Sequence, residues 1–188
     1  MMIKKLTEND ESQVLEYLYQ DPNINIFIIG DIELFRFEVD FQDLWAEYKN
    51  DEIISVLLRY KDSLVYYSHM TYFNEAYLNI INSFPYQFIS SKESLMEVVR
   101  PHFTDMKYKP MYFCEATSLD SDLIVEHSNI IDVSEDEEIR KVFRLLIQIE
   151  EFDGMKDQKE DEYVKSHLET IKHSKTFSIE EDGICAST

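Results

Sequence analysis

The feature that most limits the fold of this chain is a strand-to-helix pattern that occurs twice. In the first copy an apolar run at 3–6 precedes Thr7, a helix-capping residue with Asp10 three positions later. In the second copy the run at 130–133 precedes Ser134, with Glu137 three positions later. Both are followed by apolar residues at helical spacing. We therefore predict an internal duplication, whose aligned pairs include Ile3 with Ile130, Leu6 with Val133, Thr7 with Ser134 and Leu18 with Leu145.

The duplication extends beyond the first helix. A second apolar helix is predicted at 24–35 in the first copy and at 160–174 in the second. Two strand-like runs then flank polar turn residues in each copy, which predicts a β-hairpin at 44–59 and another from 176 onward. Each copy is therefore expected to run strand, helix, helix, hairpin.

The first copy continues where the second stops. Its further elements are predicted as a strand at 64–68, a helix at 74–84, an extended piece at 86–90, a helix at 95–103 and a strand at 108–116. The second copy reaches Thr188 inside its hairpin and is expected to lack its last ~60 to 70 residues. We predict an α/β protein with a mixed sheet of α+β type, divided into a complete unit at 1–120 and an incomplete one at 125–188, with the polar stretch 118–128 as the boundary.

Charge narrows the range of partners. The chain carries 18 basic and 38 acidic residues, a formal net charge of −20, on a sequence that is 44% hydrophobic. Such a composition predicts a folded domain with a solvated acidic surface, which repels phosphate backbones and anionic membranes. Nucleic acid and membrane are therefore not expected as partners, whereas a basic substrate is compatible with the charge.

The N-terminal residues and the two cysteines indicate the cellular compartment. The residues after Met1 are charged and polar, without the apolar run of a secretion signal or a membrane span, which favours the cytoplasm. Cys114 and Cys185 lie far apart in strand-like contexts, so both are expected to be buried, reduced thiols.

The element order resembles the GNAT N-acetyltransferase fold, the acyl-CoA N-acyltransferase architecture, in both copies. The runs NIFIIGDIE at 25–33 and DGICAST at 182–188 are similar to bacterial GNAT proteins that carry a GNAT-like half before the catalytic half. The resemblance implies a tandem GNAT-like chain with a degenerate first domain. In a complete protein it implies transfer of an acetyl group from acetyl-CoA to an amine of a small molecule or peptide.

The family's cofactor signature is Arg or Gln, two variable residues, Gly, any residue, then Gly or Ala, placed after the fourth strand. Small residues there let backbone N–H groups close around the pyrophosphate. In the first copy this place reads His69-Met70-Thr71-Tyr72-Phe73, and in the second it would follow Thr188. We therefore expect this chain to contain no residues that bind acetyl-CoA in the family manner and to be inactive by itself.

The resemblance also suggests where an acceptor could bind. In GNAT-type enzymes the link between the first two helices helps to shape the acceptor site, and in the second copy that link contains Glu150, Glu151 and Phe152. A carboxylate there could hold an amine or remove its proton through water. Tyr163 could line the same pocket. A solvated surface role for the carboxylates and a packing role for Tyr163 are the alternatives.

Other chemistry is weakly indicated. Asp31 and Glu33 are interpreted as the polar, water-facing end of a core helix, and Trp45 as a core or interface anchor. No metal site is expected, because the histidines have no ligand spacing. They are His69, His102, His127, His167 and His173.

Two functions therefore remain open: acetyl transfer by a complete GNAT protein, or a non-enzymatic binding module of degenerate GNAT fold. The uncovered second unit is expected to pack within the chain or to form a homodimer.

Overall fold

The computed structural model describes residues 2–112, 114–115, 118, 130–172 and 174–188. The chain divides into two compact units, Met1–Glu115 and Ala116–Thr188, called unit 1 and unit 2 below. Apart from residue 118, the expected boundary at 118–128 lies outside the described residues. No helix among the described residues is both long enough and apolar enough to cross a membrane.

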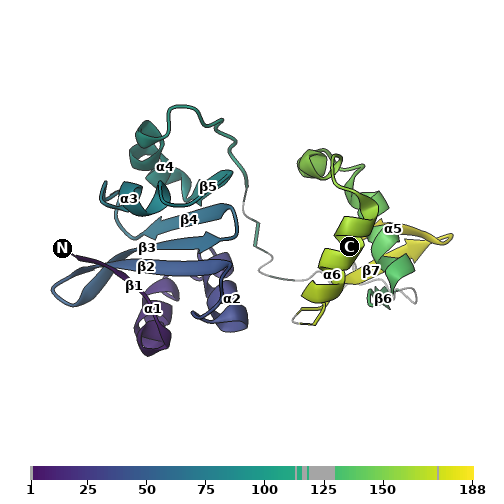
Figure 1. Ribbon diagram of the computed structural model, residues 1–188, viewed down its shortest axis with the longest axis horizontal. Coiled ribbons are helices and arrows are strands. Elements are labelled where there is room, and N and C mark those ends of the chain that lie inside the picture. The colour runs from purple at the N-terminus through teal and green to yellow at the C-terminus, as the bar shows by residue number, and fades with distance from the viewer. Residues whose placement is uncertain (1, 113, 116–117, 119–129, 173) are drawn as a thin grey trace. The chain divides into compact units, whose positions relative to one another are not determined.

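Unit 1 is built on a five-stranded mixed sheet (Figure 1). Its strands are adjacent in chain order, antiparallel from β1 to β4, while β5 pairs parallel with β4. The predicted first hairpin is confirmed as β2 and β3. The strands are β1 (Met2–Lys5), β2 (Gln42–Lys49), β3 (Glu52–Tyr60), β4 (Ser63–Ser68) and β5 (Phe88–Ser91).

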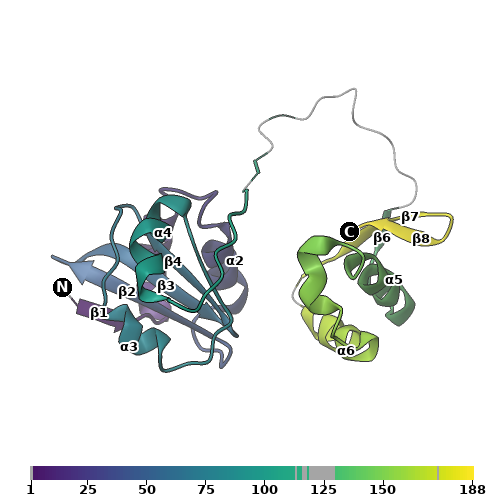
Figure 2. The ribbon, with the colours of Figure 1, turned by 90° about the horizontal axis from the view of Figure 1, so that it is seen from above.

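Helices cover both faces of this sheet (Figures 1 and 2). Those before the hairpin pack on one face and those after β4 on the other, because successive strand residues point to opposite faces. They are η1 (Glu8–Asp10), α1 (Glu11–Leu18), α2 (Ile26–Phe35), α3 (Tyr77–Ile81), α4 (Glu93–Val99) and η2 (Arg100–His102).

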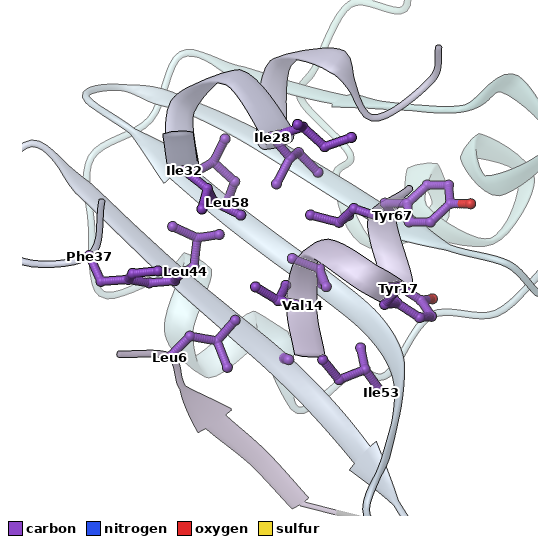
Figure 3. Close-up of a cluster of buried hydrophobic side chains, with 14 residues drawn as sticks. Leu6, Val14, Tyr17, Ile28, Ile32, Phe37, Leu44, Ile53, Leu58 and Tyr67 are labelled. Atoms are coloured by element: carbon purple, nitrogen blue, oxygen red, sulfur yellow. The ribbon is translucent and has the colours of Figure 1, made fainter. Parts of the chain in front are cut away.

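Each face has its own hydrophobic core. On the first, Val14 of α1 and Ile32 of α2 share a buried cluster with Leu44, Leu58 and other strand residues (Figure 3). The second cluster joins strand residues to Tyr77 of α3 and Val99 of α4, among others. Trp45 is 8% exposed in this second cluster, which confirms it as a core residue.

Unit 2 is a three-stranded antiparallel sheet in the order β6-β7-β8, with two helices and a 3-10 segment. Its buried cluster is small: Val133, Ile139, Val142, Val164 and Cys185. The elements are β6 (Ile130–Asp132), α5 (Asp136–Leu146), η4 (Glu150–Met155), α6 (Glu160–Thr170), β7 (Phe177–Glu181) and β8 (Ile184–Ser187).

The hairpins of the two units correspond in detail. Both have a two-residue turn with positive φ at each position, Asn50-Asp51 in unit 1 and Asp182-Gly183 in unit 2, the pattern that suits the twist of a hairpin. Both have a register shift at the same distance before the turn. In consequence Glu47, opposite Ser55, occupies the hairpin position that Ile179, opposite Ser187, occupies in unit 2.

The helix starts follow the sequence pattern with one shift. As predicted, Thr7 is tied to Asp10, whose Oδ2 accepts the Thr7 backbone N–H at 2.9 Å. In unit 2 the prediction is wrong by one residue: the N-cap is Glu135, and Glu138 accepts the backbone N–H groups of Ser134 and Glu135 at 2.9 Å each. Glu138 sits at the third helical position, where its side chain reaches both orphan donors.

Residues 108–112 form no strand, so in these described residues the strand expected at 108–116 is wrong. Pro110 lacks the N–H that a ladder needs, and Met111 and Tyr112 are 76% and 99% exposed. Cys114 is also exposed, contrary to the expectation that it is buried, whereas Cys185 is buried in the core of unit 2.

Candidate functional site

Side chains that can donate or accept hydrogen bonds lie close together in unit 1, at the end of β4. The parallel pairing of β4 with β5 extends from Ser63 with Phe88 to Tyr66 with Ser91, while β4 continues to Ser68 against β3 alone. Tyr67 and His69 therefore follow the last residue of β4 that pairs with β5. Together with Tyr17 of α1, Asp21 and Lys92 they make up what we call the β4-end cluster.

A chain of polar contacts connects this cluster. Lys92 Nζ lies 3.1 Å from Asp21 Oδ2, and the Tyr67 hydroxyl lies 3.5 Å from the same oxygen. The Tyr67 hydroxyl is also 3.0 Å from Nδ1 of His69. When the hydroxyl donates to Asp21, it can accept a hydrogen bond from Nδ1–H of His69, which leaves Nε2 with its lone pair. His69 is exposed, so the geometry suits an imidazole whose Nε2 accepts a hydrogen bond from a ligand.

Tyr17 also holds His69, through a hydrogen bond to its backbone and a contact between the two rings. Its hydroxyl donates to the Ile54 carbonyl at 2.7 Å and accepts the His69 backbone N–H at 3.2 Å. The two rings meet edge to face at 4.6 Å. Burial raises the pKa of both Tyr17 and Tyr67 to about 12, so both hydroxyls keep their protons at neutral pH. Both tyrosines are therefore neutral in the cluster, where Tyr17 accepts the His69 N–H and Tyr67 can donate to Asp21.

A second polar group lies beneath the segment after β4. Glu47 is fully buried, and its carboxylate accepts hydrogen bonds from Ser55 Oγ at 3.2 Å, Tyr72 OH at 3.1 Å and Asn74 Nδ2 at 2.7 Å. The Tyr77 hydroxyl extends this Glu47 network, 3.2 Å from Ser55 Oγ. Among the described residues no basic side chain pairs with Glu47, which is therefore held by neutral donors.

The same segment contains the residues expected to stand in place of a glycine loop. The Tyr66 hydroxyl donates to the Tyr72 carbonyl at 2.8 Å, and the Phe73 ring packs edge to face on Tyr66 at 5.1 Å. Phe73 belongs to the second core, whereas Met70 is half exposed. Tyr72 and Phe73 thus turn toward the sheet, and Met70 does not.

The site residues proposed for unit 2 are placed as follows. Glu150 is exposed in η4, Glu151 belongs to the same segment, and Phe152 is 43% exposed. Tyr163 is half-buried on α6, where its ring contacts Phe143 at 5.1 Å and burial raises its pKa. Among the described side chains no hydrogen bond, ion pair or ring contact joins Glu150, Phe152 and Tyr163.

Tyr163 has a partner that the sequence did not indicate. The His167 ring stacks on it at 5.5 Å, burial lowers the pKa of His167, and within the described residues its buried Nε2 has no hydrogen-bond partner. His102 contacts Phe73, while His127 and His173 lie outside the described residues. In the described parts of the chain, no three His, Cys, Asp or Glu side chains are grouped as metal ligands.

Asp31 departs from the water-facing position expected of it, because it is half-buried on α2. Burial raises its pKa from 3.8 to about 6. Glu33, by contrast, is exposed and accepts a hydrogen bond from the Tyr19 hydroxyl at 2.7 Å. The two carboxylates therefore differ in environment and do not act as a pair.

This difference gives a testable pH dependence. Because the folded-state pKa of Asp31 is raised, its contribution to stability is fully present below about pH 4 and is lost as pH rises to about 6. We expect Asp31→Asn to raise the free energy of unfolding of unit 1 by about 1 kcal/mol at pH 7, after allowance for partial exposure, and by less at pH 4. Urea denaturation followed by Trp45 fluorescence measures this. Equal gains at both pH values would contradict it, and Glu33→Gln is the control.

Sequence reasoning missed Tyr17, Asp21, Tyr67 and Lys92. A weak signal was present, since Tyr67 and His69 are two positions apart and a strand places such residues on one face. Asp21 and Lys92 meet only through folding.

No family model matches this chain, and no curated protein matches it either. One solved structure with some similarity is an aminoglycoside acetyltransferase from an uncultured soil metagenomic sample, in complex with sisomicin. It is 10% identical with a TM-score of 0.32, and the match covers 62% of this chain and 96% of that one. A likeness at this level does not establish a shared family. The mixed α/β architecture with a five-stranded sheet is compatible with a GNAT-like fold.

Proposed function

We propose that this chain is part of a GNAT-type acetyltransferase that moves an acetyl group from acetyl-CoA to an amine once unit 2 is completed. The supporting observation is the order of the unit 1 sheet: four antiparallel strands, then a parallel β4–β5 pair whose strands stop pairing after Tyr66 and Ser91. The matched hairpin of unit 2, with its turn and register shift at the same positions, supports a second copy of that order.

In this proposal unit 1 is the degenerate copy. Tyr72 and Phe73 occupy the segment after β4, where the family signature has small residues, and hydrogen bonds tie that segment to the sheet. A diphosphate needs free backbone N–H groups at such a place. Acetyl-CoA is therefore proposed to bind the completed unit 2 and not unit 1.

The chemistry proposed for the completed unit is direct transfer. The neutral amine attacks the thioester carbonyl, a C–N bond forms, the C–S bond breaks and CoA leaves as the thiolate, which takes up a proton from water. The amine proton passes to a base, and Glu150 or Glu151 could accept it through water while Phe152 and Tyr163 line the acceptor side. The net charge of −20 favours a cationic acceptor such as a polyamine, an aminoglycoside or a lysine side chain.

Calorimetry with acetyl-CoA tests the assignment of the cofactor. The 188-residue chain is expected to show no binding. A longer polypeptide that carries Arg/Gln-x-x-Gly-x-Gly/Ala after the second hairpin is expected to bind acetyl-CoA and to acetylate at least one of the three amine classes. Tight binding to the 188-residue chain that a Tyr72 or Phe73 substitution weakens would contradict the proposal for unit 1. An extended polypeptide that binds no CoA would contradict acetyl transfer.

The second candidate is a non-enzymatic binding module. It is favoured by the β4-end cluster, where an exposed His69 is held by Tyr17 and Tyr67 in the unit without a glycine loop. Under this alternative the extended polypeptide lacks CoA binding, and a ligand of unit 1 shifts the NMR signals of His69. If the ligand still binds His69→Ala with unchanged affinity, His69 does not hold it and this candidate is contradicted.

A further inference from the structure

Glu47 is unusual among the many acidic residues of this chain because it is fully buried. It lies on β2 directly before the register shift, on the same face of the strand as Trp45, and so faces α3 and the segment that follows β4. A buried carboxylate normally requires a cation or several hydrogen-bond donors. Here the donors are neutral, and two of them, Tyr72 and Asn74, come from that one segment.

Successive contacts tie residues 69–76 to helix α1 and to the sheet. The backbone N–H of His69 donates to the Tyr17 hydroxyl at 3.2 Å, the Tyr66 hydroxyl donates to the Tyr72 carbonyl, and Tyr72 and Asn74 donate to Glu47. Asn74 Oδ1 accepts the Ala76 N–H at 2.9 Å, which connects the segment to the start of α3. Hydrogen bonds to a carboxylate are stronger than those between neutral groups, so the two donated to Glu47 hold the segment most firmly.

We infer that Glu47 is a positioning residue that fastens residues 69–76 against the sheet of unit 1. Removing the carboxylate would remove the hydrogen bonds that the Tyr72 hydroxyl and the Asn74 amide donate to it, and the segment would open more often. The fastening follows from the contacts alone, whereas its role in closing a former diphosphate site rests on the proposed function.

Unit 2 provides an internal comparison. The residue at the position of Glu47 is Ile179, whose side chain has no group that accepts a hydrogen bond. The fastening is therefore a property of unit 1, added at one position of a hairpin that the two units otherwise share in turn and register.

Hydrogen exchange of the full chain, read at the backbone amides of 70–76, tests the inference. Glu47→Ala is expected to speed exchange of these amides roughly tenfold or more, because the segment loses the two hydrogen bonds that Tyr72 and Asn74 donate to the carboxylate. Glu47→Gln keeps the shape and an oxygen acceptor, so it is expected to restore most of the protection. Glu52→Ala, an exposed glutamate of the same hairpin, is the matched control and should change nothing.

A milder variant keeps the inference testable if Glu47→Ala does not fold. Tyr72→Phe removes one donor and retains the ring, and it is expected to speed exchange at 70–76 by severalfold. The control is Tyr112→Phe, which is 99% exposed. Unchanged exchange at 70–76 in the folded variants would overturn the inference. So would an equal increase in strands β2 to β4, because that indicates a general loss of stability and not release of one segment.

Discussion

Replacing Leu58 by alanine is expected to lower the free energy of unfolding of unit 1 by about 3 kcal/mol. Leu58 is fully buried in the central strand β3, in the same cluster as Ile28 and Ile32 of α2 (Figure 3). Truncation removes apolar contact and leaves a cavity that a sheet held on both sides cannot close. Urea denaturation followed by fluorescence measures the loss, because the chain's one tryptophan, Trp45, is buried in unit 1.

Leu34→Ala is the matched control. Leu34 lies on α2 but is 52% exposed, so the same chemical change should cost less than about 1 kcal/mol. If Leu58→Ala lowers the free energy of unfolding no more than Leu34→Ala does, Leu58 is not buried between α2 and the sheet as the structure has it.

Local signals were enough to predict the elements that lie close in sequence. Asn50-Asp51 and Asp182-Gly183 are residues that tolerate positive φ, and each forms the turn of its hairpin. Thr7 with Asp10 likewise marked the start of the first helical segment. In each case a few adjacent residues determine the conformation.

The β4-end cluster depends on contacts that no local signal contains. Asp21 follows α1 and Lys92 precedes α4. Asp21 contacts Tyr67 and Lys92 contacts Asp21 only because the sheet places β4 beside both segments. A single sequence does not say which of its many acidic residues pairs with which base. The site could therefore not be assembled before the fold was known.

For Glu47 the position in a strand could be predicted from the sequence, but its burial could not. A glutamate in a chain with 38 acidic residues is normally solvated. The hydrogen bonds that hold it come from Tyr72 and Asn74, which lie beyond β3 and β4 in the chain and return to β2 only in the folded structure. An apolar pattern indicates which face is buried, but not which polar residue finds donors on that face.

The expected strand at 108–116 failed for a related reason. Tyr108, Met111 and Tyr112 have the composition of a strand, yet in the described residues the first stacks under the Arg100 guanidinium at 5.4 Å and the other two are exposed. Strand propensity describes a side chain that fits a half-buried sheet surface. In this structure residues 108–112 pair with no strand and have no regular secondary structure.

The core of unit 2 is small enough that one truncation should have a large effect. Ile139 of α5 is fully buried against Val142, Val164 of α6 and Cys185 of β8. We expect Ile139→Ala to lower the free energy of unfolding of unit 2 by about 3 kcal/mol, because this residue joins both helices to the hairpin. Hydrogen exchange at the amides of α5, α6 and β7 measures the change, since the chain's one tryptophan lies in unit 1.

Ile130→Ala provides the control with the same residue type. Ile130 lies on β6 and is 57% exposed, so its truncation should cost less than about 1 kcal/mol and leave exchange in α6 nearly unchanged. If Ile139→Ala accelerates exchange only within α5, the helices and hairpin of unit 2 do not form one cooperative unit. If instead Ile130→Ala costs as much as Ile139→Ala, the exposed face of the β6–β8 sheet is covered in solution, as expected of a second copy that packs within the chain or dimerises.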